Sequence, residues 1–351
     1  MKIKTILICL VISFSLATVF SSCVKLKDIR PKTSSEISSL GESPASQPSH
    51  SESEIPAVGS AEIPSICEES SAVSEVSEDA PAPAEYSYKG YNIKGFTTLQ
   101  ADGLLDQISA VLNGAKADFG IYYEELTTGY SISFNADTKF CSASVIKAPY
   151  AMYLMTSGVD LNQTLTLSSS QKMDGSGVLR NNPSGSKYTI EKLIEYSITQ
   201  SDNTAYRMLY DNFDFGDFNR YTFRLGIDTS CSSSSHLGYL GFMTAFEAGM
   251  FFKDIYIKSQ SSDNVKRLLE YLKNTSYSYL LPGGITEYSV AHKYGYMTGA
   301  YKVLHDAGIV LAPKPYVIAI MTNFNPSGGN GRSAFQNISS YINTFHNSLE
   351  S

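Results

Sequence analysis

The stretch CSASVIKAPYAMYL, residues 141–154, places a serine and a lysine three positions apart at the start of an apolar run. On a helix, Ser144 and Lys147 would lie on one face, so the hydroxyl and the amine would be neighbours. Burial in the apolar run would lower the pKa of the lysine, and a neutral amine can accept the serine proton. The first turn of such a helix also offers backbone N–H groups to an oxyanion. The spacing therefore indicates a nucleophilic serine with a lysine base.

The S-x-x-K spacing is not unusual in a chain so rich in serine. It occurs four times, at Ser22 and Lys25, Ser144 and Lys147, Ser169 and Lys172, and Ser184 and Lys187. Only the second pair begins an apolar helix, so it alone is a candidate catalytic pair.

Two further short patterns carry groups that suit the same chemistry. Ser-Asp-Asn occurs at Ser201–Asn203 and again at Ser262–Asn264. The second copy stands directly before an apolar-periodic helix and is predicted to be an N-cap without a chemical role. The first copy follows a helix end on a turn, although a capping role is an alternative for it too. In VAHKYGYM, Lys293 lies in a predicted strand, where a lysine is usually a solvated edge residue, but Gly295 beside it permits close backbone approach.

The elements that would position these residues follow from periodicity and turn signals. Alternation on both sides of a Thr-Thr-Gly turn predicts a β-hairpin over residues 118–135. Helices are predicted over residues 142–156, 188–200, 263–274 and 332–348, and strands over 288–297, 302–312 and 315–324. Strands at both ends with helices between them predict an α/β (α+β) fold, in which an antiparallel sheet is flanked by helices and carries an inserted all-helical lobe.

The first 86 residues differ in composition from the rest. Residues 1–23 combine two lysines, a short apolar run and a terminal Cys23, which is typical of a lipoprotein-type signal peptide, with an ordinary secretory signal as the alternative. Residues 24–86 hold 15 serines, 7 prolines and 12 acidic against 4 basic residues, which predicts a disordered tether. Residues 87–351 are long enough for one large domain, and they are close to neutral, so nothing indicates nucleic-acid binding. The cysteine spacing predicts neither a disulfide framework nor a zinc site.

Taken in chain order, Ser144-x-x-Lys147, Ser201-Asp202-Asn203 and Lys293-x-Gly295 match a known three-part set. On these motifs residues 87–351 resemble the class A β-lactamases and penicillin-binding serine hydrolases. The resemblance implies the β-lactamase/transpeptidase-like fold, with a five-stranded sheet. It also implies that the protein is a monomer and needs neither a cofactor nor a metal.

The resemblance also implies a role for each motif residue. Ser144 would be acylated, with Lys147 as its base or proton relay, and Ser201 would pass a proton to the leaving nitrogen. Lys293 would attract a substrate carboxylate and stabilise charge near Ser201, while Asp202 would tie the turn together. The backbone N–H groups of Ser144 and Tyr296 would form the oxyanion hole. The residues that would contact substrate are Asn203, Tyr294, Gly295 and Tyr296.

The chain departs from the family pattern in two places. The third motif has Tyr294 where the family has Thr or Ser, so a small hydroxyl that would bind the substrate carboxylate is missing. No glutamate occurs between Asp202 and Phe246, where the family places its deacylation base. Asp228 and His236 are alternative bases for water, whereas His292 and His305 are expected to pack near the sheet.

The motifs predict a serine acyl enzyme that acts on a β-lactam or a peptidoglycan-like peptide and hydrolyses its acyl-enzyme slowly. A D-Ala-D-Ala-type peptidase is one alternative, and an acylated or non-catalytic cell-wall or β-lactam sensing module is another. The signal predicts a protein attached to the outer face of the bacterial cell membrane through a lipid on Cys23, with no other membrane contact.

Overall fold

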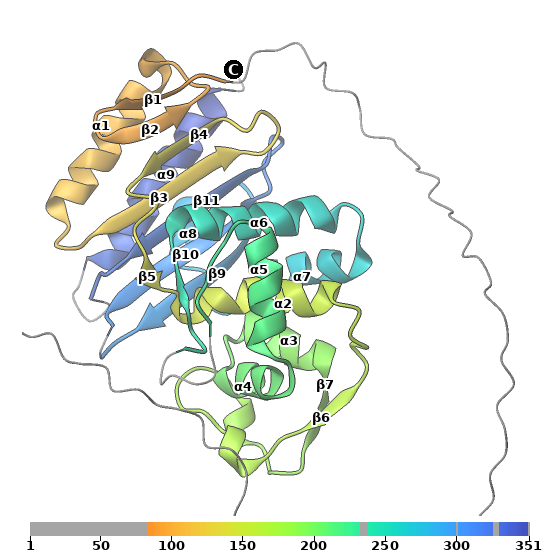
Figure 1. Cartoon of the computed structure of the whole chain (residues 1–351). Coiled ribbons are helices and arrows are strands. Elements are labelled where there is room, and N and C mark those ends of the chain that lie inside the picture. Colours follow the sequence, from red (N-terminus) through yellow and green to blue (C-terminus); the bar gives the residue numbers. More distant parts are fainter. Residues whose placement is uncertain (1–82, 232–237, 300, 326–329, 350–351) are drawn as a thin grey trace, which may run out of the picture. The chain divides into compact units, whose positions relative to one another are not determined.

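A computed structural model describes residues 83–231, 238–299, 301–325 and 330–349 of the chain (Figure 1). All of them belong to one compact unit, Glu75–Ser351. The proposed signal and nearly all of the proposed tether lie outside the described residues. Among the described residues, no helix is long and apolar enough to cross a membrane.

The main sheet is antiparallel and has the strand order β1-β2-β4-β3-β11-β10-β9. Its strands are β1 (Glu85–Tyr88), β2 (Tyr91–Lys94), β3 (Phe119–Glu125), β4 (Ser131–Phe134), β9 (Val290–Met297), β10 (Val303–Val310) and β11 (Tyr316–Thr322). The predicted hairpin and the three predicted C-terminal strands are all present, and they make up five of these strands.

The sheet described here has seven strands rather than the expected five, because an N-terminal hairpin adds to β4. Tyr88 pairs with Tyr91 across a two-residue turn of Lys89 and Gly90. Both turn residues have positive φ, at 53° and 82°, which is the type I′ geometry that matches the twist of two antiparallel strands.

The two faces of the sheet bury separate cores because successive strand residues point to opposite sides. Along β11, Tyr316, Ile318 and Ile320 pack in the core that α1 (Thr98–Gly114) and α9 (Gly331–Ser348) cover. Val317 and Met321 pack in the other core, where α6 (Ala245–Ser259) lies against β3, β10 and β11. Each such side chain contributes about 1.5–3 kcal/mol when it is fully buried.

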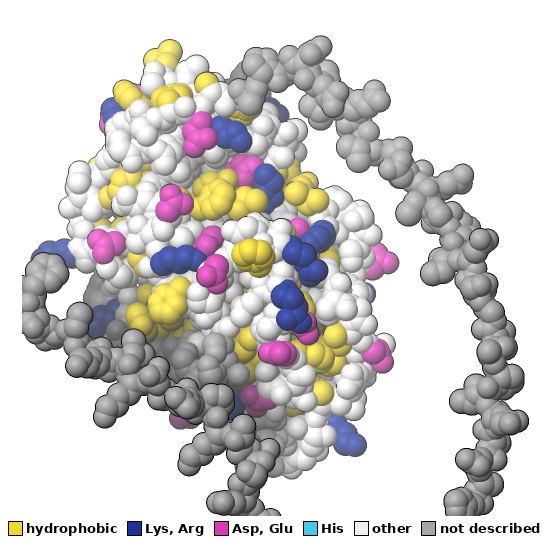
Figure 2. All heavy atoms as spheres, in the orientation of Figure 1, with side chains coloured by type: hydrophobic (Ala, Val, Ile, Leu, Met, Phe, Trp, Pro, Cys, Tyr) yellow, Lys and Arg dark blue, Asp and Glu magenta, His cyan; other side chains and the backbone are white. Residues whose placement is uncertain are grey.

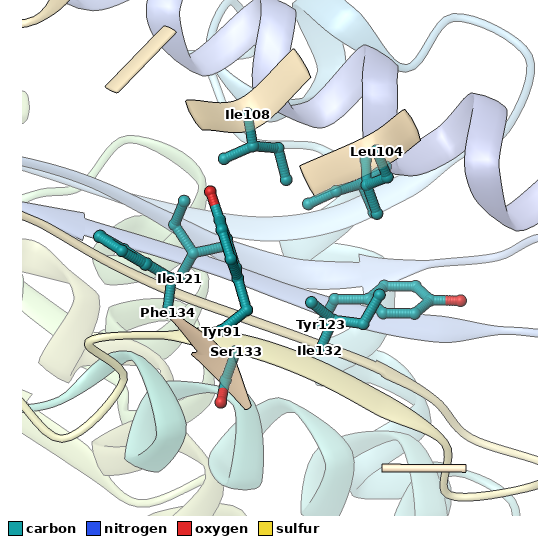
Figure 3. A pocket seen from close by; sticks show the side chains of 9 residues that line it. Tyr91, Leu104, Ile108, Ile121, Tyr123, Ile132, Ser133 and Phe134 are labelled. Carbon is teal, nitrogen blue, oxygen red and sulfur yellow. The ribbon is translucent and has the colours of Figure 1, made fainter. Parts of the chain in front are cut away.

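The core covered by α1 and α9 contains a small gap, shown in Figure 3. Its volume is about 10 Å³, roughly enough for one water molecule. Its lining comes mainly from aromatic and aliphatic side chains, and it contains none of the motif residues: Tyr91, Leu104, Ile108, Ile121, Tyr123, Ile132, Ser133, Phe134 and Ile342. The gap is therefore a packing feature of the core, remote from the motif chemistry.

The inserted helical lobe packs on the α6 side of the sheet, and its apolar residues continue the core there. It contains α2 (Lys147–Thr156), α3 (Ile190–Thr199), α4 (Asn203–Asn212), α5 (Phe215–Arg224) and α7 (Asp263–Lys273), with the short α8 (Leu281–Gly284) following. Two small two-stranded ladders complete it, β5 (Phe140–Cys141) with β8 (Phe242–Met243) and β6 (Thr164–Thr166) with β7 (Lys187–Thr189). Tyr150 of α2 contacts the rings of Tyr206, Phe215 and Phe218, which ties α2 to α4 and α5. Figure 1 shows α2 between the sheet on one side and α3 and α4 on the other, while α7 packs directly against β9.

The helices differ from the sequence prediction in several places, since α4, α5 and α8 were not among the predicted helices. The helix predicted over residues 142–156 begins as a 3-10 turn, Ala143–Ile146, and becomes α-helical only at Lys147. Helix α1 was not predicted, although Thr97 and Gln100 form a capping box at its start.

Candidate active site

Three segments far apart in the sequence meet through two lysine side chains. The Lys147 amine donates to the Ser201 carbonyl oxygen at 2.6 Å and to Asn203 Oδ1 at 2.8 Å, and it lies 3.4 Å from Ser201 Oγ. The Lys293 amine donates to the same Ser201 Oγ at 2.9 Å. Ser201 thus joins α2 to β9, and the predicted convergence of Lys147, Ser201, Asn203 and Lys293 is present in the structure.

Ser144 lies on the 3-10 turn directly before Lys147, and its side chain is partly exposed. Its hydroxyl makes no hydrogen bond to another described residue. The preceding Ala143 has φ of 47°, a strained left-handed conformation for a residue with a side chain. This backbone turns the chain sharply into α2 and leaves Ser144 in the first turn, where N–H groups lack intrahelical acceptors.

Gly295 lets β9 come close to this turn. A Cβ atom at this position would lie 3.1 Å from the Ser142 carbonyl oxygen and 3.0 Å from a Val145 methyl group. The close backbone approach that the glycine permits is therefore made by the chain's own 142–145 segment. Tyr296 follows on the same edge strand, with 49% of its surface exposed.

The Ser201–Asn203 turn is held by Asp202. Its carboxylate accepts from the N–H of Ala205 as the N-cap of α4, and also from the N–H groups of Val178 and Leu179. Asp202 is fully buried, which agrees with its expected structural role. Ser201 stands just outside the helix with φ of 50°, so its hydroxyl points toward the lysines.

Asn203 connects the amine to the lobe. Its Oδ1 accepts from Lys147, and its Nδ2 donates to the Asp174 carbonyl oxygen at 2.8 Å. The bond from Lys147 fixes which end of the amide is the oxygen. Asn203 therefore orients Lys147 and joins it to the loop over residues 174–179.

Both lysines are buried, and no described carboxylate forms an ion pair with either amine. Burial lowers the pKa of Lys147 to about 7, with the negative charge of Asp202 opposing the shift. Burial and the nearby Lys147 charge lower the pKa of Lys293, while Asp306 opposes that shift. Because the two amines share Ser201, they disfavour being charged together. A neutral Lys147 is thus available near neutral pH.

Two buried histidines lie on strands of the sheet near the site, His292 on β9 and His305 on β10. His292 Nδ1 lies 2.8 Å from Asp306 Oδ1, and its Nε2 lies 2.8 Å from Thr275 Oγ1. His305 accepts from the Thr322 N–H, so its Nε2 donates to the Cys141 carbonyl oxygen, and burial lowers its pKa to about 4. Both histidines pack within the sheet region, as expected.

Asp228, one of the two candidate water-activating groups, does not join the lysine cluster. The Asp228 carboxylate accepts from the N–H and hydroxyl of Ser230, at the rim of a hollow of about 530 Å³ over α5. It makes no hydrogen bond to Ser144, Lys147 or Ser201. Glu247, the first glutamate after Asp202, lies in the capping box of α6 and pairs with Lys139. His236 lies outside the described residues.

Sequence reasoning gave no role to Tyr277 or Asp306. Tyr277 packs against Tyr294, with ring centroids 4.6 Å apart. Asp306 could have been noticed as a carboxylate in the middle of the apolar strand LHDAGIVLA, whereas nothing local marks Tyr277. Among the described residues, no group of three or more His, Cys, Asp or Glu side chains is placed to hold a metal ion.

An antiparallel sheet with an inserted helical lobe, and a serine-lysine pair beside a second serine and lysine, defines an active-site serine hydrolase architecture. The chain belongs to the Beta-lactamase enzyme family, because that family's sequence model matches residues 103–345. The resemblance drawn from the three motifs is therefore confirmed.

Individual relatives agree with this family. β-Lactamase ROB-1 of Haemophilus influenzae is 27% identical over 228 residues, covering 59% of this chain and 72% of that protein. A solved acyl-enzyme complex of a PBP-A mutant with penicillin G has a TM-score of 0.64 at 23% identity, covering 71% of this chain and 97% of that one. A class A β-lactamase from Bacteroides cellulosilyticus has a TM-score of 0.63 at 20% identity, covering 71% and 99%. These structures confirm the β-lactamase fold.

Proposed function

We propose that the protein forms an acyl-enzyme at Ser144 with a β-lactam or a related amide and then hydrolyses it slowly. The observation that carries this proposal is the hydrogen-bonded series from Lys147 through Ser201 to Lys293. Ser144, three residues before Lys147, has a hydroxyl that no described residue engages. Family membership supports the reaction class.

In the acylation step the neutral Lys147 amine accepts the Ser144 proton while Ser144 Oγ bonds to the carbonyl carbon. The N–H groups of Ser144 and Tyr296 stabilise the oxyanion, each contributing roughly 3 kcal/mol. As the carbon–nitrogen bond breaks, the proton passes from Lys147 to Ser201 and on to the leaving nitrogen. The Lys147–Ser201 distance of 3.4 Å is a loose starting geometry for this transfer, which a bound ligand would tighten.

In the deacylation step water attacks the Ser144 ester, releases the carboxylic acid and returns the proton to Ser144. No glutamate lies between Asp202 and Phe246 to activate this water. Loss of a positioned general base lowers a rate by about two to four powers of ten, so the acyl-enzyme is long-lived.

A fluorescent penicillin tests the nucleophile. We expect it to label the purified protein covalently and to leave Ser144→Ala unlabelled. Ser184→Ala is a matched control, because Ser184 has the same S-x-x-K spacing but lies on an exposed loop. Persistent labelling of Ser144→Ala would reject Ser144 as the nucleophile.

The fate of the adduct separates the alternatives. Release of hydrolysed penicillin over minutes to hours supports the slow hydrolase. A permanent adduct favours a D-Ala-D-Ala-type peptidase or a sensor, and cleavage of a D-Ala-D-Ala peptide then identifies the peptidase. Absence of labelling, with reversible binding of a muropeptide, favours a non-enzymatic binding module.

We also propose that the protein is exported and held at the outer face of the bacterial cell membrane by a lipid on Cys23, as a monomer. The signal-like run before Cys23 and the tether composition of residues 24–86 support this placement. Incorporation of a radiolabelled fatty acid into the wild type, and its loss in Cys23→Ser, would test the anchor. Equal incorporation in both would reject it.

A further inference from the structure

The Lys293 amine is enclosed by protein groups rather than exposed to solvent. Its side chain has 0% exposure. It donates to Ser201 Oγ and to the carbonyl oxygen of Tyr294, and it lies 4.3 Å from the centroid of the Tyr294 ring. One side of this buried amine is therefore covered by an aromatic face, whose negative quadrupole favours the charged form.

The Tyr294 side chain reaches from β9 toward the helical lobe. Burial raises its pKa to about 12, and hydrogen bonding from Ser176 and Ser201 opposes that shift. The phenol thus lies beside the 174–179 loop as well as beside the Ser201 turn. Only 5% of Tyr294 is exposed.

Tyr277 holds this ring in place from outside. Its ring lies 4.6 Å from that of Tyr294, and 37% of Tyr277 is exposed. The segment that carries Tyr277 is attached to the lobe, since the Ser276 N–H donates to the carbonyl oxygen of Thr199. The two tyrosines form an aromatic cover over Lys293, with Tyr294 inside and Tyr277 outside.

We propose that this aromatic cover, Tyr277 and Tyr294, selects ligands that are uncharged next to Lys293, such as an ester or amide, over ligands with a carboxylate there. The inference rests on the proposed acylation of Ser144 and names its substrate class. The free-energy cost of dehydrating a carboxylate is offset only if the carboxylate forms direct, charge-assisted hydrogen bonds to the amine. The Tyr294 ring lies 4.3 Å from the amine and limits its access to such bonds, whereas an uncharged group can pack against the ring.

The test compares acylation by a fluorescent penicillin with acylation by its methyl ester, which differ only in that charge. Tyr294→Thr removes the ring and keeps a hydroxyl. We expect it to increase the acid-to-ester ratio of acylation rates by roughly ten-fold or more, as expected for one gained charge-assisted bond. Tyr294→Phe keeps the ring and should retain the wild-type ratio, whatever its absolute rate. Tyr277→Ala should give a smaller increase. An unchanged acid-to-ester ratio in Tyr294→Thr would refute the proposal that the aromatic cover selects uncharged ligands.

A second readout does not depend on acylation. Wild type, Tyr294→Phe and Tyr294→Thr are each exposed to an amine-reactive reagent, and modification of Lys293 is measured by peptide mass spectrometry, with circular dichroism as the check on folding. We expect protection in both and at least a several-fold faster modification of Lys293 in folded Tyr294→Thr. If no variant is acylated but Lys293 becomes reactive in Tyr294→Thr, the proposed reaction fails and the cover stands. Equal protection in all three variants rejects the cover even if acylation occurs.

Discussion

The tripeptide Ser-Asp-Asn occurs twice in this chain and has two different structural roles. At residues 262–264 the serine is the N-cap of α7, and its hydroxyl accepts from the Val265 N–H. At residues 201–203 the N-cap of α4 is the aspartate, so the helix begins one residue later in the tripeptide. The same three residues are therefore placed in two different registers.

This shift of one residue decides which side chains are free for chemistry. In the second copy the serine hydroxyl satisfies the helix end, and the amide of Asn264 bonds to Met155 and Arg267. In the first copy Asp202 satisfies the helix end, which leaves Ser201 outside the helix in a left-handed conformation. In this chain, the copy in which the aspartate takes the capping role is the one whose serine contacts the two lysines.

The largest expected difference between the two copies is in the acylation rate. Ser201→Ala should lower the acylation rate by about two to four powers of ten, because it removes the hydroxyl that relays a proton to the leaving nitrogen. Ser262→Ala should leave that rate unchanged. Stopped-flow labelling with the fluorescent penicillin measures both, and equal rates in the two variants would remove the functional distinction.

The next effect is on stability. Asp202→Asn places an NH₂ group against the N–H groups of Val178 and Leu179, so the free energy of unfolding should fall by about 3 kcal/mol. Asp263→Asn, at an exposed position in the first turn of α7, should change it by less than about 0.5 kcal/mol. Urea unfolding followed by circular dichroism gives both values. A similar loss in the two variants would argue against the special role of Asp202.

The pH dependence should also separate the two copies, because only the first is near a titrating amine. If neutral Lys147 is the base, the acylation rate should rise with pH and level off, with the midpoint of the rise at about pH 7. Below that pH the rate should fall about ten-fold per pH unit. The charge of Asp202 raises the pKa of Lys147, so Asp202→Asn should move that midpoint to lower pH. Asp263→Asn should not move it. A flat profile in the wild type would exclude Lys147 as the base.

The same pKa has a consequence for stability. The folded pKa of Lys147 lies below its ordinary value of 10.5, so unfolding takes up a proton between about pH 7 and that value. The contribution of this group therefore becomes more favourable to folding as pH rises from 7. In Lys147→Met the free energy of unfolding should rise less over this range than in the wild type, measured by urea unfolding at pH 7 and pH 9.

The smallest effect concerns the helix cap itself. Ser262→Ala should lower the free energy of unfolding by about 1 kcal/mol through loss of the α7 cap. Ser261→Ala, one residue earlier and exposed, is the matched control and should change it by less than about 0.5 kcal/mol. Equal values for the two would show that the 3.5 Å bond of Ser262 contributes nothing.

Local patterns predicted much of this molecule. Alternation predicted the β3–β4 hairpin and the three C-terminal strands, and the apolar-periodic run after Ser262 correctly predicted a cap there. The N-terminal hairpin was not predicted because its stability depends on pairing with β4, about 40 residues later in the chain. Helix α1 was not predicted because Gly103 weakens its helical pattern and its apolar side gains stability only against the sheet and α9.

The order of the three motifs was enough to predict that Lys147, Ser201 and Lys293 meet. What could not be predicted is which other residues contact Asp202 and Lys293. The cap register at Asp202 depends on N–H groups from the 178–179 loop, and the cover over Lys293 depends on a ring from the segment after α7. These contacts depend on how distant segments pack in the folded domain, and no residue spacing in the sequence indicates them.

The N-terminal hairpin has a consequence for how copies of the protein behave toward one another. A strand at the edge of a sheet has unpaired backbone groups onto which a foreign strand can add. Here that edge is β1, which is only four residues long and alternates between exposed and partly buried side chains. Its turn carries Lys89, paired with Asp102 and Asp106, so charged groups stand at its end. The domain thus closes this side of its sheet with a short, charged border that discourages aggregation in concentrated solution.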